Sequence, residues 1–236
     1  MIKPGIITPD SLKIIKQRIQ IACEKSGRDI ENIKIIAVTK TFGIEAINSA
    51  LSLGINCIGE NKVQELEFKS PQILDKSNKE IHFIGHIQSN KVRKIIKLAD
   101  VIQTVDSLKL ASRINNISKE LNKKTTIYIQ INTAKDDKKF GFYPKEVLNV
   151  SKAIIKMKNL NFIGIMTIPP MSKDYDLLKT IFNKTRKIKD DIQNQINPKC
   201  KYLSMGMSND FETAIGCGAT HIRLGTILFG NRVVKN

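Results

Sequence analysis

The chain has 236 residues, 41% of them hydrophobic and 26% charged, which fits a globular protein of one large domain or two small ones. No apolar run approaches the roughly 18 residues needed to cross a bilayer, and residues 1–20 lack the features of a secretion signal, so we expect a cytoplasmic protein with no membrane partner. The net charge is +17, but only seven of the 39 cations are arginine and lysine is spread along the chain, which indicates a compositional bias rather than nucleic-acid binding.

The predicted elements alternate between helix and strand. Helical periodicity comes first, over residues 11–25. Short runs rich in Ile and Val then recur eight times, at 33–38, 55–58, 81–85, 101–105, 125–132, 161–166, 201–205 and 220–225. Segments with helical periodicity lie between them, at 45–53, 90–98, 107–121, 146–157 and 175–196.

This order predicts a (β/α)8 barrel. Strands that read as continuous apolar runs and are separated by helices form parallel sheets covered by those helices, and eight such units match a closed barrel. No linker divides the chain, so we expect one domain over residues 1–236 with an extra N-terminal helix. An open doubly wound sheet is the main alternative, but its glycine fingerprint after the first strand is missing.

Lys40 follows the first apolar run, in the stretch IIAVTKTFG. Active sites of (β/α)8 barrels are built at the carboxyl ends of the strands, so Lys40 is a candidate site residue. An amine in a partly desolvated pocket can be neutral and attack a carbonyl to form a Schiff base. A lysine at this position on its own is more commonly a solvated boundary residue.

The segments after the last two strands predict a phosphate site. Barrels often hold phosphate with the loops after strands seven and eight. Here SMGMSNDFETAI (204–215) and RLGTILFG (223–230) place Gly206, Ser208, Gly225 and Thr226 in those loops. Backbone amides and hydroxyls there could bind a phosphate monoester. The alternative is ordinary helix capping by Ser208 or Asn209 and an ordinary turn at Gly225.

Arg223 lies near the end of the last apolar run, where a guanidinium needs a partner or a ligand. A structural ion pair would satisfy it, and so would the ring nitrogen of pyridoxal 5′-phosphate (PLP), for which arginine is one known partner. A reactive lysine, a phosphate site and this arginine together indicate PLP.

The chain also resembles a known family over nearly its whole length. AVTKTFG, GENKVQE (59–65), HFIGHIQSNK (82–91), QIN (130–132), KKFG (138–141), SMGMSND (204–210) and IRLGT (222–226) are similar to signatures of the PLP homeostasis proteins. The resemblance implies a barrel like the alanine racemase N-terminal domain, with PLP held as a Schiff base on Lys40. Thr39 and Gly43 stand where that family often has Ser and Pro, and neither removes a proposed cofactor contact.

Other polar positions are less specific. Asn61 follows the second strand and could reach the cofactor ring, or cap a helix; Met166, at the end of the sixth strand, should pack against the cofactor. Loop hydrogen bonding is favoured for His86 and Gln88, and solvation for Lys139.

No metal site is predicted. The four cysteines, at positions 23, 57, 200 and 217, are dispersed and form no C-x-x-C pair, which argues against a zinc knuckle, a redox motif or a disulfide framework. His82 opens the third strand, at the end of the barrel opposite the catalytic face.

Two functions remain, a PLP carrier and a PLP-dependent racemase. A two-base racemase of the alanine type needs a second base from a separate C-terminal domain, and this chain ends just after its last barrel segment. An arginine at the ring nitrogen also keeps that nitrogen unprotonated and weakens the cofactor as an electron sink. We therefore expect a monomeric carrier and buffer of PLP in vitamin B6 and amino-acid homeostasis. It would not be an enzyme, and PLP-dependent apo-enzymes would be its recipients.

Overall fold

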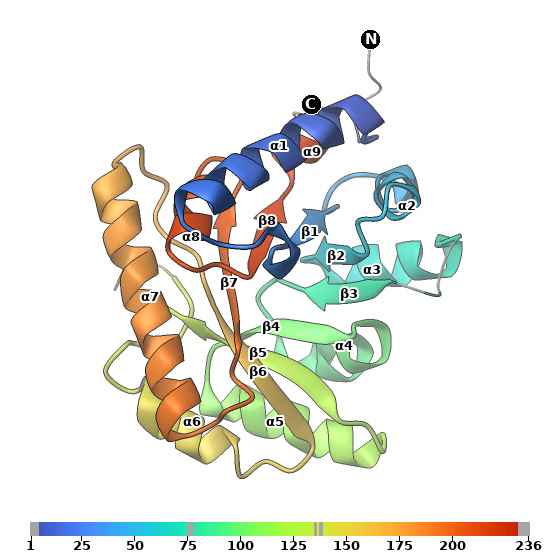
Figure 1. The fold of residues 1–236 in the computed structure, drawn as a ribbon. Coiled ribbons are helices and arrows are strands. Elements are labelled where there is room, and N and C mark those ends of the chain that lie inside the picture. The colour runs from blue at the N-terminus through green and yellow to red at the C-terminus, as the bar shows by residue number, and fades with distance from the viewer. Residues whose placement is uncertain (1–4, 75–76, 78, 135, 137–138, 231–236) are drawn as a thin grey trace.

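The computed structural model describes residues 5–74, 77, 79–134, 136 and 139–230. Its centre is a closed barrel in which each strand pairs in parallel with the next and β8 pairs with β1 (Figure 1). The strands are β1 (Lys34–Val38), β2 (Cys57–Glu60), β3 (Glu80–Phe83), β4 (Val101–Val105), β5 (Thr125–Ile131), β6 (Leu160–Thr167), β7 (Tyr202–Met207) and β8 (His221–Leu224). The predicted fold class is confirmed.

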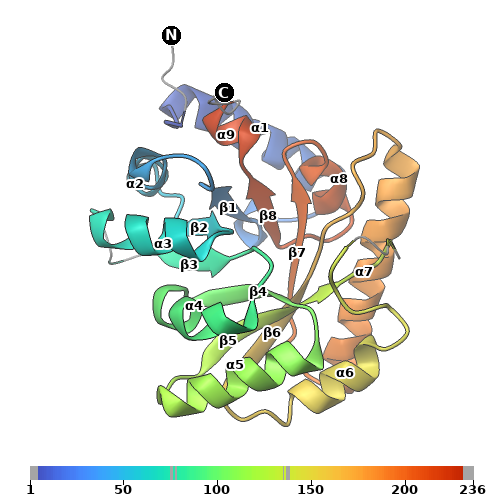
Figure 2. The same cartoon turned by 180° about the vertical axis from the view of Figure 1, so that it is seen from behind.

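Helices surround the barrel, as the two opposite views show (Figures 1 and 2). They are α2 (Ile44–Ser52), α3 (Val63–Lys69), α4 (Val92–Leu98), α5 (Leu108–Glu120), α6 (Val147–Ile154), α7 (Tyr175–Gln195), α8 (Phe211–Gly216) and α9 (Thr226–Phe229), with 3-10 turns η1 (Ile30–Asn32), η2 (Ser70–Gln72) and η3 (Ser89–Lys91). Helix α3 lies outside the segments for which helical periodicity was predicted.

The extra helix α1 (Pro9–Lys25) precedes the barrel and packs against α8 and α9 (Figure 1). A capping box starts it: the Thr8 side chain accepts from the Ser11 amide at 3.2 Å, and the Ser11 hydroxyl accepts from the Thr8 amide at 3.1 Å. Pro9 occupies the first turn, where its missing N–H costs nothing. The predicted helix is confirmed, with its start two residues earlier than Ser11.

Two layers of side chains leave the strands in alternation. The outward layer is apolar and joins the helices in one large cluster. The inward layer carries buried polar groups, among them His82, Gln103, Ser204 and Arg223, beside a small apolar cluster of Val101, Tyr128 and Met166. Barrel interiors are more often filled by branched apolar residues, so this polar interior needs an explanation in function.

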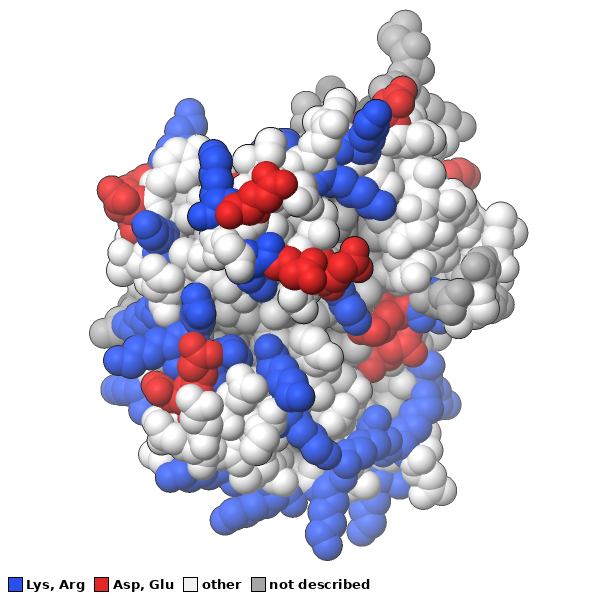
Figure 3. Space-filling view, viewed as in Figure 1, with Lys and Arg blue, Asp and Glu red and all other residues white. Residues whose placement is uncertain are grey.

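The surface is strongly basic. Figure 3 shows lysines and arginines scattered over the left side and the lower part of one face, with acidic side chains among them. Cations spread in this way do not single out one groove for a polyanion. Across the described residues, no helix is long and apolar enough to cross a membrane.

Candidate functional site

Lys40 lies two residues after β1 ends at Val38, in a tight turn. The Phe42 amide donates to the Thr39 carbonyl at 3.1 Å and closes the turn. Thr41 has a φ of 69°, an uncommon conformation for a β-branched residue, which costs on the order of 1–3 kcal/mol. The Lys40 side chain is half-buried, the environment in which a lysine amine loses part of its hydration.

Four side chains hold this turn, and we call them the Lys40 clamp: Thr39, Glu60, Glu65 and Lys69. Lys69 Nζ lies 2.7 Å from Glu60 Oε1 and 3.1 Å from Glu65 Oε2, and it donates to the Thr39 carbonyl at 3.0 Å. The Thr39 hydroxyl donates to Glu60 Oε1 at 2.7 Å, and Glu65 Oε2 accepts from the Thr41 amide at 2.7 Å. Contacts on both sides of Lys40 therefore fix its backbone in the strained turn.

The electrostatics of the clamp depend on burial. Glu60 and Lys69 have side chains only 0% and 4% exposed. Burial raises the pKa of the Glu60 carboxyl, and its contacts with Lys69 and Thr39 offset only part of that effect. Glu60 Oε2 is buried and has no hydrogen-bond partner among the described residues. The carboxylate therefore depends on Lys69 for its charge.

Asn61 directly follows β2, on the same side of the barrel as Lys40. Its Oδ1 atom is buried and has no hydrogen-bond partner among the described residues, so an acceptor is available there for a ligand. Its backbone packs tightly on the next loop, since a Cβ atom on Gly85 would lie 2.0 Å from the Asn61 carbonyl oxygen. The Gly85 carbonyl accepts from the Thr104 hydroxyl at 2.6 Å, which connects this loop to β4.

Arg223 projects into the barrel and is 5% exposed. Nη1 donates to Ser204 Oγ at 2.8 Å and Nη2 to the Thr167 carbonyl at 2.9 Å; the Ser204 hydroxyl donates to Gln103 Oε1 at 2.7 Å. Burial lowers the pKa of Arg223 to about 10, so the guanidinium remains charged at neutral pH. In the described part of the chain it forms no ion pair, although Asp210 attracts it from farther away. A buried cation held by neutral oxygens favours a ligand over a structural ion pair.

The loops after β7 and β8 meet at Ser208. Its Oγ atom is 3.4 Å from the amide nitrogens of Gly225 and Ile227, both of which point at it. Two amides directed at one oxygen could bind an oxygen of a phosphate group instead. Thr226, the first residue of α9, is exposed beside them.

The alternative that Ser208 or Asn209 caps the next helix does not hold. Helix α8 begins at Phe211, and Asp210 occupies the N-cap position without a side-chain cap. The Asp210 carboxylate accepts instead from the Met207 amide at 2.5 Å, which closes a turn and leaves Ser208 facing the β8 loop. Gly206, with a φ of 92° and Ala214 packed where a Cβ atom would stand, makes this turn possible.

The strand register places these loops around one opening at the carboxyl end of the barrel, which we call the mouth. Val38 pairs with Gly59, so Lys40 and Asn61 both lie two residues beyond a paired position. A Cβ atom on Gly225 would lie 3.5 Å from the Val38 carbonyl, which places the β8 loop beside the Lys40 turn. Met166 pairs with Ser204, and its side chain is fully buried. The predicted residues therefore gather at the carboxyl ends of the strands, with Met166 and Arg223 inside the barrel.

Two other loop residues serve local contacts. His86 Nδ1 is 3.3 Å from Asp106 Oδ2, and the imidazole stacks on Phe140 with ring centroids 3.7 Å apart, in agreement with a loop role. The expectation that Lys139 is solvated was wrong: its Nζ donates to the Pro169 carbonyl at 2.9 Å and its side chain is only 29% exposed. Lys139 thus connects the loops after β5 and β6.

Comparison with known proteins fits this geometry. Residues 11–233 match the family model described as the alanine racemase N-terminal domain. The pyridoxal phosphate homeostasis protein of Aquifex aeolicus is 34% identical over 223 residues, which cover 94% of this chain and 97% of that protein. The one from Haemophilus influenzae is 36% identical over 227 residues, 94% of each chain. The chain belongs to the family of pyridoxal phosphate homeostasis proteins.

Solved structures place this homeostasis-family chain among proteins of the same barrel. PipY of Synechococcus elongatus, in a structure described as having PLP bound, is 32% identical, covers 92% of this chain and 100% of its own, and has a TM-score of 0.79. Alanine racemase of Clostridium difficile has a TM-score of 0.76 but only 18% identity, over 96% of this chain and 58% of the enzyme, which shows the fold alone. The family resemblance predicted from the sequence is confirmed.

Proposed function

We propose that this protein binds PLP at the carboxyl end of its barrel through Lys40 and serves as a carrier and buffer of the cofactor. The observation that carries the proposal is the meeting of three features at one mouth: the clamped, half-buried Lys40, the buried Arg223, which has no ion pair with any described residue, and the two amides directed at Ser208. The names of the curated relatives and the PLP-bound structure of PipY support it.

The residues present fit PLP. The Oδ1 atom of Asn61, which has no hydrogen-bond partner within the described part of the chain, marks a polar position open to a ligand, and Arg223 supplies a buried donor set. PLP supplies an aldehyde that condenses reversibly with a lysine amine, with loss of water, to form a Schiff base. Lys40 would provide that amine, and the amides of Gly225 and Ile227 with the Ser208 and Thr226 hydroxyls would hold the phosphate. Met166 would pack beside the ring.

The role of Arg223 favours a carrier over an enzyme. A charged guanidinium donates a hydrogen bond to the ring nitrogen and disfavours its protonation, so the ring withdraws electrons less strongly. Proton removal from a bound amino acid is then poorly assisted. PLP-dependent apo-enzymes of the cytoplasm would be the recipients, and the carrier would act as a monomer. The alternative, a PLP-dependent racemase, shares only the barrel.

Reduction with borohydride tests the site. The protein is incubated with PLP, reduced, digested, and its peptides are mapped by mass spectrometry; the pyridoxyl group should be on Lys40 in stoichiometric amount. Lys40→Ala should lose this label while keeping its fold, because Lys40 lies outside the barrel strands. Lys139→Ala, which changes another lysine near the mouth, should keep it. A label found mainly on another lysine in the wild-type protein would refute the assignment.

A further inference from the structure

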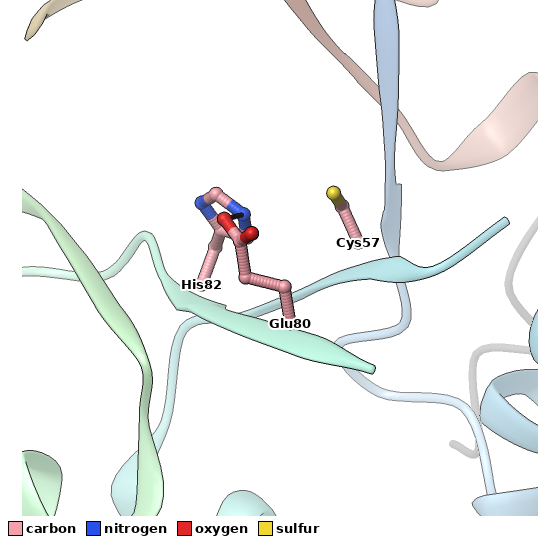
Figure 4. Close-up of side chains that lie close together, drawn as sticks. All are labelled: Cys57, Glu80 and His82. Atoms are coloured by element: carbon pink, nitrogen blue, oxygen red, sulfur yellow. Dashed lines mark ion pairs between the residues drawn. The ribbon is translucent and has the colours of Figure 1, made fainter. Parts of the chain in front are cut away.

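A second cluster of reactive side chains lies at the opposite, amino end of the barrel. Cys57 begins β2 and Glu80 begins β3, and the two residues are paired in register. His82 follows Glu80 by two positions and so projects from the same face of the strand. Figure 4 shows the three side chains close together above β2 and β3. One thiol sulfur, one carboxylate oxygen and one imidazole nitrogen lie within 4.8 Å of one another.

His82 is oriented as a metal-binding histidine would be. Its side chain is fully buried, and Nδ1 is held by the Gln103 side-chain amide at 2.8 Å. Nε2 faces the cluster and pairs with Glu80 Oε1 at 2.8 Å, so the imidazole and the carboxylate lie side by side as two ligand groups. Metal-ligating histidines are typically held through their other nitrogen in this way.

The cluster is reachable from solvent. A cavity of about 540 Å³ is lined by Cys57 and Glu80 together with residues of α1, η1 and the start of β1. It offers room for a water molecule beside Cys57 and Glu80. Lys34 also lines the cavity and would repel a cation, but it is exposed and can extend its ammonium group into water. Glu31 lines the same cavity and carries the opposite charge.

We propose that Cys57, Glu80 and His82 form a binding site for a divalent cation of the zinc type, with water from the cavity as the fourth ligand. Sulfur, imidazole and carboxylate are the donors that zinc takes, and three protein ligands with one open position are typical of accessible zinc sites. Magnesium and calcium prefer oxygen ligands alone. The sequence did not predict this site, because its ligands lie on two strands and form no short motif.

Binding requires proton movements that balance. Burial, with a smaller effect of Glu80, raises the pKa of Cys57 to about 11, so the thiol is protonated before the metal arrives and releases one proton to solvent when the sulfur–metal bond forms. Nε2 of His82 must carry a lone pair, which places the imidazole proton on Nδ1. The Gln103 amide then has to turn over, so that its oxygen accepts from Nδ1 and its nitrogen, instead of its oxygen, faces Ser204 Oγ. No electron transfer is involved.

Titration with Co²⁺ tests the site, because a cobalt–thiolate bond gives near-ultraviolet charge-transfer absorption and a tetrahedral ion gives intense visible bands. Metal-free wild-type protein, kept reduced, should bind one equivalent with both signatures, and Zn²⁺ should displace it. Cys57→Ser should lose the charge-transfer band, and His82→Gln should bind at least tenfold more weakly. Cys217→Ser, a change at another buried cysteine, should behave as the wild type. Lys40→Ala should also bind normally, which separates this site from the PLP site.

A second measurement uses the wild-type protein alone. One equivalent of Zn²⁺ should slow alkylation of Cys57 and leave that of Cys200 unchanged, as read by mass spectrometry. Circular dichroism establishes whether Cys57→Ser and His82→Gln remain folded. The proposal is overturned if equimolar Co²⁺ gives no charge-transfer band, if the band survives in folded Cys57→Ser, or if Zn²⁺ leaves the alkylation of Cys57 unchanged.

Discussion

Lys69 and Glu60 meet at 2.7 Å, both buried, directly beneath the turn that carries Lys40. The pair lies at the centre of the Lys40 clamp, because Lys69 also donates to the Thr39 carbonyl and Glu60 accepts from the Thr39 hydroxyl. A reactive lysine on an exposed loop would sample many positions, whereas this one starts from a backbone fixed on both sides. The clamp therefore links the stability of the fold to the geometry of the site.

Lys69→Met should destabilise the protein and impair the Lys40 site. Removing one partner of a buried ion pair typically costs about 3–5 kcal/mol. Because burial already raises the pKa of Glu60, this carboxyl should take up a proton in the variant, and the loss should be smaller at acidic pH. Urea unfolding and the rate of PLP binding measure the two effects. Lys62→Met, at a 60% exposed lysine 3.7 Å from Glu65, is the control and should change either quantity little.

Ser208→Ala combined with Thr226→Ala should weaken PLP more than pyridoxal, which lacks the phosphate. Hydrogen bonds to a charged group contribute on the order of 1.5–3 kcal/mol each, so PLP affinity should fall at least tenfold. Equilibrium titration of both aldehydes, followed by absorbance, measures the difference. Asn209→Ala changes an exposed neighbour and should leave both affinities intact. Equal weakening of PLP and pyridoxal would show that neither hydroxyl contacts the phosphate.

The PLP-loaded protein should racemise alanine slowly and still pass its cofactor on. Arg223 stays charged at neutral pH and disfavours a protonated ring nitrogen, so removal of the Cα proton is poorly assisted. Racemisation and the reactivation of a PLP-dependent apo-enzyme can be followed with one preparation. Reactivation should be faster than release of PLP into buffer allows. A racemisation kcat within the usual enzyme range of roughly 1–10³ s⁻¹ would establish the racemase instead.

The barrel and the mouth of the site could be predicted from the sequence for physical reasons. Runs of Ile and Val separated by helices leave few alternatives to a parallel barrel, and such a barrel places Lys40, Ser208 and Gly225 at the same end. The support beneath them could not be predicted. Glu60 and Lys69 read as ordinary surface charges until the short helix α3 turns Lys69 inward.

The polar interior of the barrel could not be predicted from the sequence either. Gln103 and Ser204 lie on β4 and β7, far apart in the sequence, and nothing in the residues around either one indicates a partner. Only closure of the barrel makes them partners of each other and of Arg223. The role of Ser208 could be predicted only in part. A serine just before a helix suggests an N-cap, but the Asp210 carboxylate accepts from the Met207 amide and leaves Ser208 facing the β8 loop.

Stability should fall as the pH rises from about 9 to 12, in part through Cys200. Burial raises the pKa of this thiol from 9.0 to about 12, so in that window the folded state keeps a proton that the unfolded chain has lost. Unfolding then releases a proton, and each such thiol lowers the free energy of unfolding by about 1.4 kcal/mol per pH unit. Cys200→Ala should give a shallower decline in urea unfolding measured at several pH values under reducing conditions. Burial raises the pKa of the Cys217 thiol less, so Cys217→Ala should reduce the pH dependence of the stability less.

The contact between Gly85 and the Asn61 carbonyl limits how the mouth can move. With 2.0 Å between a Cβ atom at position 85 and that oxygen, even alanine would force the loops after β2 and β3 apart. In a saturation scan, position 85 should therefore accept fewer substitutions than Gly216, which has open space around it and an ordinary φ. Because these two loops pack so closely, they have to move together as one rigid unit whenever the mouth widens to release a cofactor.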